Sequence, residues 1–107
     1  MITQLGEIEV EPQPYADYRP LFETTPLNVT HVRVWPGETV SARVQGDEHR
    51  VYYVVSGEGV VELGSGTTPM SAGSGALIPI GTEHAITNTG TEPLDDVFFL
   101  VSVPERS

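Results

Sequence analysis

Glycine and proline residues divide this chain into short segments, and their spacing limits its possible folds more than any other feature. Eleven glycines and nine prolines interrupt its 107 residues. From Asn28 onward they separate β-prone runs at a spacing of about 8–12 residues, which is typical of sandwiches and barrels. No segment shows sustained helical periodicity. The sequence therefore predicts an all-β domain with strands at Leu5–Val10, Asn28–Trp35, Thr39–Gln45, Arg50–Ser56, Val60–Leu63, Gly75–Pro79, Glu83–Asn88 and Asp96–Val103.

The segment 11–27 is set apart by four prolines with aromatic residues between them. Proline lacks the backbone N–H that a sheet ladder or a helix interior needs, so we expect neither a ladder nor a long helix here. The aromatic residues favour an ordered arm that covers an open sheet edge over a disordered linker. The predicted organisation is a single domain, with an N-terminal strand and Pro-rich arm at 1–27 and a barrel at 28–107.

Charge and composition exclude several classes of function. Fifteen acidic residues against five basic ones give a formal net charge of −10. Such a surface repels phosphate backbones and anionic lipids, so we expect neither nucleic acid nor a membrane as a partner. The absence of lysine excludes Schiff-base chemistry, and the absence of cysteine excludes thiolate metal sites and disulfides. The sequence shows no signal peptide and no apolar run of membrane-spanning length, so we expect a cytoplasmic location.

Two runs of consecutive apolar residues bear on assembly. Val51–Val55 and Val97–Val101 are apolar at every position, whereas a strand with one wet face alternates apolar and polar residues. A single small barrel buries only the inner face of its strands. A second subunit is therefore needed to cover the outer face, and we expect a homodimer.

A specific motif lies within residues 73–88, where five residue types follow one another as G-x5-P-x-G-x2-H-x3-N. The matching residues are Gly73, Pro79, Gly81, His84 and Asn88. This pattern resembles the second conserved motif of the cupin family, and Gly37 with the stretch 49–59 resembles the frame of the first. The resemblance covers about residues 28–103. It implies a jelly-roll β-barrel, also called a double-stranded β-helix, with the N-terminal arm outside it.

The metal ligands of the family are mostly missing from this chain. Cupins commonly hold a transition metal on three histidines and one glutamate. The corresponding positions here are occupied by Arg43, Gln45, Arg50 and His84. A guanidinium group has no lone pair to offer and repels a cation, so we expect no cofactor. The alternative keeps a divalent transition metal on His84, with shifted ligands drawn from Gln45, Glu48, His49 and His31.

The polar residues at these positions predict a binding site for an anionic small molecule. Strand alternation and the motif frame direct five side chains into the barrel, namely Arg43, Gln45, Arg50, Tyr52 and His84. The planar fork of an arginine matches a carboxylate or a phosphate, so Arg43 and Arg50 are the predicted anion ligands. The alternative is that both arginines pair with the chain's own carboxylates, such as Glu58, Glu62 or Glu83, or reach the mouth of the barrel.

His84 is the predicted general acid or base, because histidine titrates near neutral pH, and Tyr52 is its predicted proton partner. Nearby arginines would lower the pKa of His84 and favour the neutral base. The alternative is a hydrogen-bonded core histidine without a catalytic role.

The sequence also bears on whether two further pairs of residues belong to the substrate site. Arg33 and Trp35 share one face of the strand Asn28–Trp35 and would join the substrate site if that face is interior. The alternative is that this face is solvated. Asp95 and Asp96 are expected to be solvated loop charges.

The sequence therefore predicts a metal-free cupin that binds a small anionic or carbonyl-containing molecule and performs acid/base chemistry on it. Isomerisation, epimerisation, dehydration and cyclisation are the reaction types that such side chains support without a redox cofactor. Two alternatives remain at this point, a small-molecule binding cupin without catalysis and a metal-dependent cupin with a remodelled ligand shell around His84.

Overall fold

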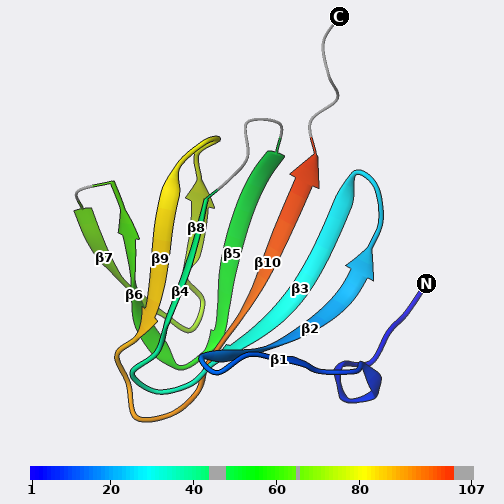
Figure 1. Cartoon of the computed structure of the whole chain (residues 1–107), viewed down its shortest axis with the longest axis horizontal. Helices are drawn as coiled ribbons and strands as arrows, with labels where there is room; N and C mark the ends of the chain where they lie inside the picture. The colour runs from blue at the N-terminus through cyan, green and yellow to red at the C-terminus, as the bar shows by residue number, and fades with distance from the viewer. Residues whose placement is uncertain (44–47, 65, 103–107) are drawn as a thin grey trace, which may run out of the picture.

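The computed structural model describes residues 1–43, 48–64 and 66–102. Within them ten strands form two antiparallel sheets that curve around a common interior (Figure 1). The six-stranded sheet has the order β1-β2-β3-β10-β5-β8, and the four-stranded sheet has the order β4-β9-β6-β7. The strands are β1 (Glu11–Pro12), β2 (Ala16–Glu23), β3 (Leu27–Val34), β4 (Thr39–Arg43), β5 (Glu48–Ser56), β6 (Glu58–Leu63), β7 (Gly66–Ser71), β8 (Gly75–Ile78), β9 (Glu83–Asn88) and β10 (Leu94–Ser102). No helix in the described part of the chain is long and apolar enough to cross a membrane.

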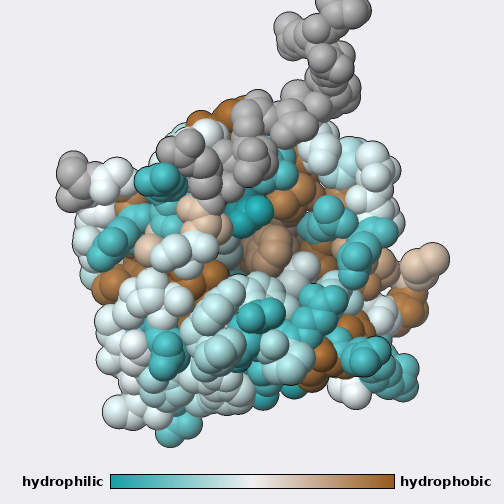
Figure 2. Space-filling model, viewed as in Figure 1, coloured by the Kyte–Doolittle hydropathy of each residue, from teal (hydrophilic) through white to brown (hydrophobic). Residues whose placement is uncertain are grey.

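Alternation along each strand decides which side chains form the core. In β5, Tyr52 and Val54 are buried, whereas Val51, Tyr53 and Val55 on the other face are exposed. Hydrophobic side chains are recessed in the middle of the face seen in Figure 2, with hydrophilic ones around them. The core cluster comprises Ala16, Val32, Val34, Tyr52, Val54, Val61, Met70, Ile78, Ile86 and Leu94. The all-β prediction is thus confirmed, while the outer face of β5 is left open in the single chain.

A close approach of two backbones requires glycine at position 57. Gly57 has a φ of +88°, a conformation that residues with a Cβ rarely adopt. A Cβ built there would lie 2.5 Å from the carbonyl oxygen of Pro93. A larger residue would push the turn after β5 away from the segment that leads into β10. The requirement for glycine at this position of the first-motif frame is therefore steric.

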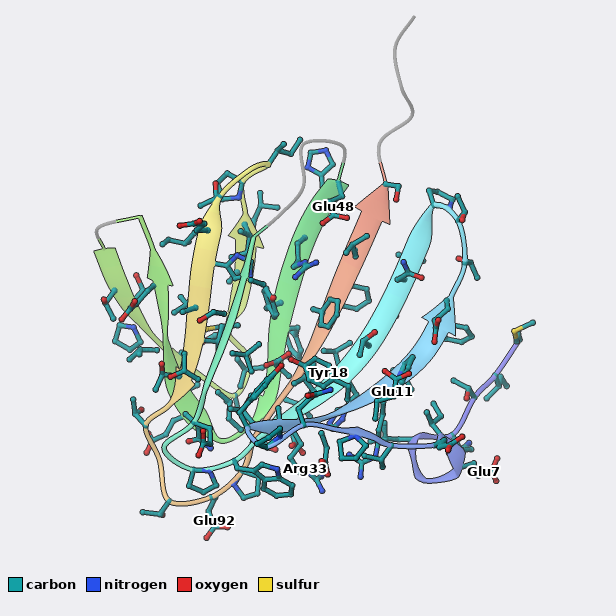
Figure 3. The ribbon with its side chains drawn as sticks, viewed as in Figure 1. Glu7, Glu11, Tyr18, Arg33, Glu48 and Glu92 are labelled. Atoms are coloured by element: carbon teal, nitrogen blue, oxygen red, sulfur yellow. The ribbon has the colours of Figure 1, made fainter. Side chains whose placement is uncertain are left out.

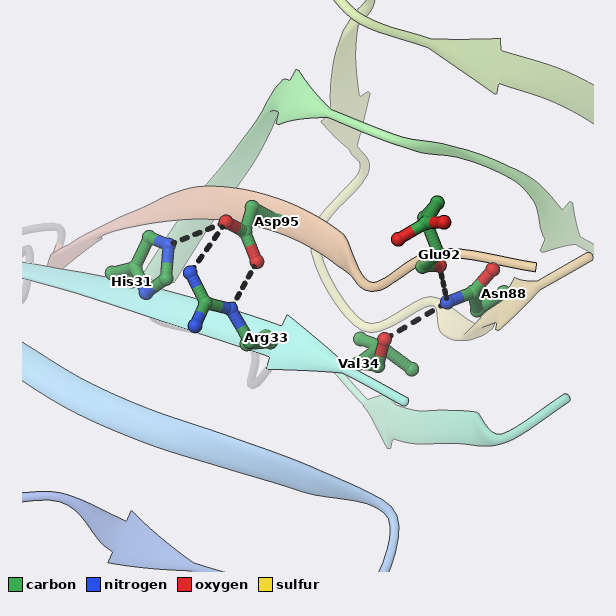
Figure 4. Close-up of polar contacts among 6 residues, drawn as sticks. All are labelled: His31, Arg33, Val34, Asn88, Glu92 and Asp95. Carbon is green, nitrogen blue, oxygen red and sulfur yellow. Dashed lines mark hydrogen bonds and ion pairs between the residues drawn. The ribbon is translucent and has the colours of Figure 1, made fainter. Parts of the chain in front are cut away.

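Asn88 ties the end of β9 to the opposite sheet. Its side-chain amide donates to the carbonyl oxygens of Val34, at 2.9 Å, and Glu92, at 2.8 Å (Figure 4). Its side-chain oxygen accepts from the backbone N–H of Gly90 at 2.9 Å. Asn88 is fully buried, and its hydrogen bond to Val34 is buried with it. The last residue of the second motif is therefore a structural cross-link between the sheets.

The N-terminal region differs from the prediction. Leu5–Val10 is not a strand, since Leu5–Glu7 forms a 3-10 helix. The expectation that 11–27 holds no ladder is also wrong, because β2 pairs with β3 along Ala16–Glu23. Pro20 is accommodated where the register of that ladder shifts, and Pro12 lies in the short edge strand β1. Both are places where a missing N–H is tolerated.

Strand β7 was missed for a different reason. Gly66–Ser71 pairs with β6 at the edge of the four-stranded sheet. Only Met70 in this strand is buried, so the segment carries no apolar alternation that would signal a strand. The predicted end of the strand Thr39–Gln45 and Val103 lie outside the described residues, as do Gln45 and the side chain of Arg43.

Replacing Asn88 tests the cross-link. We expect Asn88→Ala to lower the free energy of unfolding by about 2–4 kcal/mol, because it removes the partner of the buried Val34 carbonyl and of the partly buried Glu92 carbonyl and Gly90 N–H. Urea denaturation followed by tryptophan fluorescence would measure the loss. The control is Thr89→Ala at the exposed neighbouring position, which should change stability by less than about 0.5 kcal/mol. Equal losses in the two variants would contradict the role of Asn88.

Candidate functional site

A small cavity lies in the interior between the two sheets, with a volume of about 80 Å³. Its lining residues are Tyr18, Val32, Val40, Ser41, Ala42, Arg50, Tyr52, Ile86, Asp96 and Phe98. A second hollow of about 310 Å³ shares Tyr18, Arg50 and Phe98 with it. Ligand sites usually measure about 300–1,000 Å³, so the cavity by itself fits only a small group, and the adjoining hollow adds room for the rest of a ligand.

Arg50 is held at the junction of these two hollows. Its Nη1 donates to the Tyr52 hydroxyl at 3.4 Å, and its Nη2 lies 3.6 Å from the carboxylate of Glu48. Its guanidinium carbon stands 5.1 Å from the centre of the Phe98 ring, in cation–π geometry. Its Nε is buried and has no partner within the described chain. Arg50 therefore faces the cavity with a donor to spare, although Glu48 supplies part of the pairing that the alternative interpretation required.

The hydroxyl of Tyr52 connects Arg50 to His84. It lies 2.9 Å from Nε2 of His84, and the two rings meet edge to face with centroids 5.4 Å apart. The other ring nitrogen of His84, Nδ1, lies 3.3 Å from the carbonyl oxygen of Thr82. A carbonyl oxygen can only accept, so Nδ1 carries the proton and Nε2 accepts from Tyr52. The result is a directed chain of donors from Arg50 through Tyr52 and His84 to Thr82.

Burial controls the protonation states of His84 and Tyr52. It lowers the pKa of His84, and the charge of Arg50 lowers it further against the opposing hydrogen bond to Thr82. Burial also raises the pKa of Tyr52, against the opposing effect of Arg50. At neutral pH His84 is therefore neutral and Tyr52 is protonated, which is the state that the hydrogen bonds require.

His84 itself does not line the interior cavity. It is buried, and it borders a separate hollow of about 450 Å³ near the outer side of β4, β6 and β9. That hollow is lined by Ser41, Ala42, Glu62, Gly64, Glu83 and Ala85 beside His84. Among the side chains that the structure describes, its lining includes two carboxylates and no arginine, whereas the hollow beside the cavity has Arg50 as well as Glu11 and Glu23. His84 reaches the cavity only through Tyr52.

The sequence analysis missed Asp96. It was expected to be a solvated loop charge, but its side chain is 2% exposed and lines the cavity. Its Oδ1 has no hydrogen-bond partner. Burial, with a smaller contribution from Asp95, raises the pKa of Asp96 to about 7. Counting in steps of two from the buried Leu94 would have predicted that Asp96 points inward.

Asp95, expected to be a solvated loop charge as well, lies on the opposite face of β10 and is paired with Arg33. Nε of Arg33 donates to one carboxylate oxygen at 2.8 Å and Nη2 to the other at 3.0 Å, and Nε2 of His31 lies 3.7 Å away (Figure 4). Although burial acts to raise it, the paired Arg33 holds the pKa of the Asp95 carboxyl below its ordinary value. This cluster explains why His31 is buried yet remote from the cavity.

Arg33 and Trp35 therefore do not join the site. Val32, next to Arg33 in β3, lines the cavity, so alternation places Arg33 on the outer face. Trp35 follows the last residue of β3 and is absent from the cavity lining. Glu48 lies near one end of the barrel and Arg33 near the other (Figure 3). The structure brings together Arg50, Tyr52 and His84 from the predicted set.

The described residues do not fit the usual metal of the family. Nε2 of His84 is engaged by Tyr52, and Arg50 stands where a ligand would be needed. His49 is exposed and His31 belongs to the outer face. Within residues 1–43, 48–64 and 66–102 no group of three or more His, Cys, Asp or Glu could hold a metal ion. A cation at this position would meet the charge of Arg50.

Comparison with known proteins agrees with the barrel and the motif. The sequence pattern of the cupin domain matches residues 30–99. The chain belongs to the cupin family. A relative, polyketide synthase CurC of Streptomyces cyaneus, is 30% identical over 104 residues, which span 92% of this cupin and 68% of that protein. The oxalate-binding protein of Thermotoga maritima is 33% identical over 60 residues, which span 56% of this cupin and half of that protein.

Solved structures show the same fold. A predicted oxalate decarboxylase from Thermotoga maritima superposes with a TM-score of 0.88 and 22% identity, covering 96% of this cupin and all of that chain. Ectoine synthase from P. lautus superposes with a TM-score of 0.82 and 16% identity, covering 97% of this cupin and 79% of that chain. The predicted jelly-roll barrel is confirmed by these superpositions.

The donor chain predicts how His84 titrates. In an NMR pH titration we expect its pKa below the ordinary value of 6.5, because burial disfavours the imidazolium ion. The contribution of His84 to stability is then present above the ordinary pKa and decreases as the pH falls below it, since the unfolded chain binds the proton more tightly.

Replacing Arg50 measures how much its charge contributes to the lowered pKa of His84. Arg50→Met should raise the pKa of His84 and still leave it below 6.5, because burial is the larger cause. Arg33→Met, which removes the same charge from the opposite face, is the control and should leave the titration unchanged. A normal pKa in the unsubstituted protein would contradict the proposed hydrogen-bond directions.

Proposed function

We propose that this cupin binds a small anionic or carbonyl-containing molecule in its interior cavity and performs acid/base chemistry on it without a metal ion. The observation that carries the proposal is the donor chain from Arg50 through Tyr52 to His84, which meets the cavity wall at its first two members. Arg50 supplies a positive charge and an unpaired Nε for a ligand oxygen.

Tyr52 and His84 divide the proton transfer between them. Tyr52 faces the cavity and can exchange a proton with the ligand, while His84 accepts or returns the Tyr52 proton at Nε2. His84 is thus a positioning and relay residue, and Tyr52 is the catalytic residue. Relocation of a proton next to a carbonyl group is the shared step of isomerisation, epimerisation, dehydration and cyclisation.

The names of two relatives support this ligand class. One is called a polyketide synthase and the other an oxalate-binding protein. Polyketides and oxalate are rich in carbonyl and carboxylate oxygens, which are the acceptors that Arg50 and Tyr52 can serve. The shared chemistry is an oxygen acceptor next to a carbonyl carbon.

A binding protein without turnover is the second candidate. The observation that favours it is that His84 lacks direct access to the cavity, so the donor chain can also serve only to fix Tyr52 and Arg50. Turnover separates the two candidates, because both require the same ligand contacts.

Acetoacetate and oxalate are suitable probes, since acetoacetate combines a ketone with a carboxylate. In isothermal titration calorimetry we expect Arg50→Met to weaken binding by about 10–100-fold, the effect of losing a hydrogen bond to a charged group. Arg33→Met should bind as the unsubstituted protein does. NMR in deuterated water should show catalysed deuterium uptake at C2 of acetoacetate, abolished in Tyr52→Phe. Binding without deuterium uptake would support the second candidate.

A metal requirement is tested in the same experiment. Elemental analysis of protein purified without chelator, followed by titration after dialysis against EDTA, should give the same affinity before and after. A stoichiometric transition metal that is lost in His84→Ala, together with lost binding after EDTA, would replace the proposal by a metal site with a remodelled ligand shell.

We also propose that this cupin forms a homodimer through the outer face of its six-stranded sheet. Val51 lies beside Leu77 of β8 and Phe99 of β10 in one row across three strands. These side chains are 37%, 65% and 37% exposed, and Tyr53 and Val55 extend the surface. A contiguous apolar area of this kind is typical of an interface.

Light scattering coupled to gel filtration tests the dimer. We expect a mass of twice the 11.6 kDa of one chain, and a monomer for Tyr53→Asp, because a charge would be buried in the interface. Thr67→Asp, on the exposed edge strand β7 of the other sheet, is the control and should remain dimeric. A monomer in the unsubstituted protein would contradict the proposal.

A further inference from the structure

Asp96 combines three properties that the donor chain does not explain. It is almost completely buried, its Oδ1 has no partner, and it lines the interior cavity. Nη1 of Arg19 and Nδ1 of His31 are also buried without a partner, but neither residue lines the cavity. Asp96 instead faces a space in which a ligand can supply the missing partner. Among the residues that line the cavity, Asp96 is the only carboxylic acid.

We propose that Asp96 is the general acid of the cavity, donating a hydrogen bond, and during turnover a proton, to a carbonyl or carboxylate oxygen of the bound ligand. This inference rests on the proposed function and assigns to the same site a second catalytic residue, on a different strand from Tyr52.

The register of the six-stranded sheet places Asp96 beside the predicted ligand. Asp96 lies between Val54 of β5 and Val32 of β3, and Tyr18 of β2 continues this row. The next interior row along the strands contains Tyr52 and Phe98. Asp96 and Tyr52 are therefore diagonal neighbours on one inner surface, and a ligand in the cavity can contact both.

The groups around Asp96 favour its neutral form. Among the side chains that the structure describes, the charged or titratable residues that face the cavity with it are Tyr18, Tyr52 and Arg50, and β4 and β9 contribute Val40, Ser41, Ala42 and Ile86. The only ion pair of Arg50 within the described chain is with Glu48. Asp95, on the outer face, adds a negative charge behind Asp96. A pKa near 7 follows from burial and this charge, so a protonated donor is present at neutral pH.

The proton balance of an enolisation fits this arrangement. Tyr52 takes a proton from the carbon next to the ligand carbonyl and passes its own hydroxyl proton to Nε2 of His84. Asp96 gives its proton to the carbonyl oxygen. The C–H bond and the O–H bonds of Tyr52 and Asp96 break, while a new O–H bond forms on Tyr52, an N–H bond on Nε2 of His84 and an O–H bond on the ligand. The electron pair of the C–H bond becomes the new carbon–carbon double bond, and the π pair of the carbonyl group binds the proton from Asp96. Reversal of these transfers returns the protons, so no oxidant or reductant is needed.

The first measurement needs no ligand. In protein labelled with ¹³C at aspartate carboxyl groups, one resonance should titrate with a midpoint of about 7 and be absent from Asp96→Asn. Asp95→Asn, the same change at the neighbouring position on the other face, should keep this resonance and move its midpoint to lower pH, because it removes the charge of Asp95. A midpoint below about 5 for Asp96 would overturn the inference whatever the ligand does.

The second measurement is the affinity for acetoacetate and oxalate as a function of pH. If binding needs the protonated carboxyl, the affinity of the unsubstituted protein should fall about thirtyfold between about pH 6 and pH 8.5. Asp96→Asn keeps an N–H donor and cannot ionise, so its affinity should be the same at both pH values, whereas Asp95→Asn should keep the decrease.

The outcomes separate this inference from the proposed function. Binding whose pH dependence is the same in Asp96→Asn and in the unsubstituted protein would overturn the role of Asp96 and leave the proposed function intact. No binding of either probe to any variant at about pH 6 would overturn the proposed ligand class, and the donor role of Asp96 with it.

Discussion

The interior of this barrel is narrow and largely buried, and that constraint governs every polar residue that faces it. A strand directs alternate side chains inward, so a polar group that faces the cavity must find a partner there or remain unpaired at a cost in stability. Tyr52 and His84 satisfy each other, and Thr82 satisfies the remaining nitrogen of His84. Of the four buried side-chain atoms without partners among the described residues, two belong to residues that line the cavity, namely Nε of Arg50 and Oδ1 of Asp96. They mark the place where a ligand is expected.

Under the proposed function, the same constraint explains why the site would suit an anionic ligand. Once arginine replaces a metal ligand, its charge excludes a cation and requires an acceptor. Tyr52 and Glu48 supply acceptor oxygens for Arg50, and the Phe98 ring packs against its guanidinium group. The histidine retained from the family motif then serves as an acceptor for a tyrosine. The proposed function would thus keep the motif and the fold of the family and rely on proton transfer by side chains.

Sequence reasoning succeeded where local patterns decide structure and failed where distant strands decide it. The offsets of the second motif predicted the barrel, and alternation from Arg50 predicted that Tyr52 faces His84. Alternation alone could not decide which face of β3 carries Arg33. The pairing of β3 with β10 places Asp95 beside Arg33 on the outer face, where the two side chains bind each other. The ladder of β2 was missed because prolines argue against a strand unless a bulge or an edge absorbs them.

The sequence by itself determined the fold family, the acidic surface, and the replacement of metal ligands by arginine, because each follows from residue types at fixed spacing. Only the tertiary structure decided which polar groups meet. The contact of Tyr52 with His84 joins two sheets, and the isolation of Asp96 depends on β2, β3 and β5 packing around β10. Burial and pairing are properties of neighbours from distant parts of the chain, so the protonation of this site exists only after the barrel has closed.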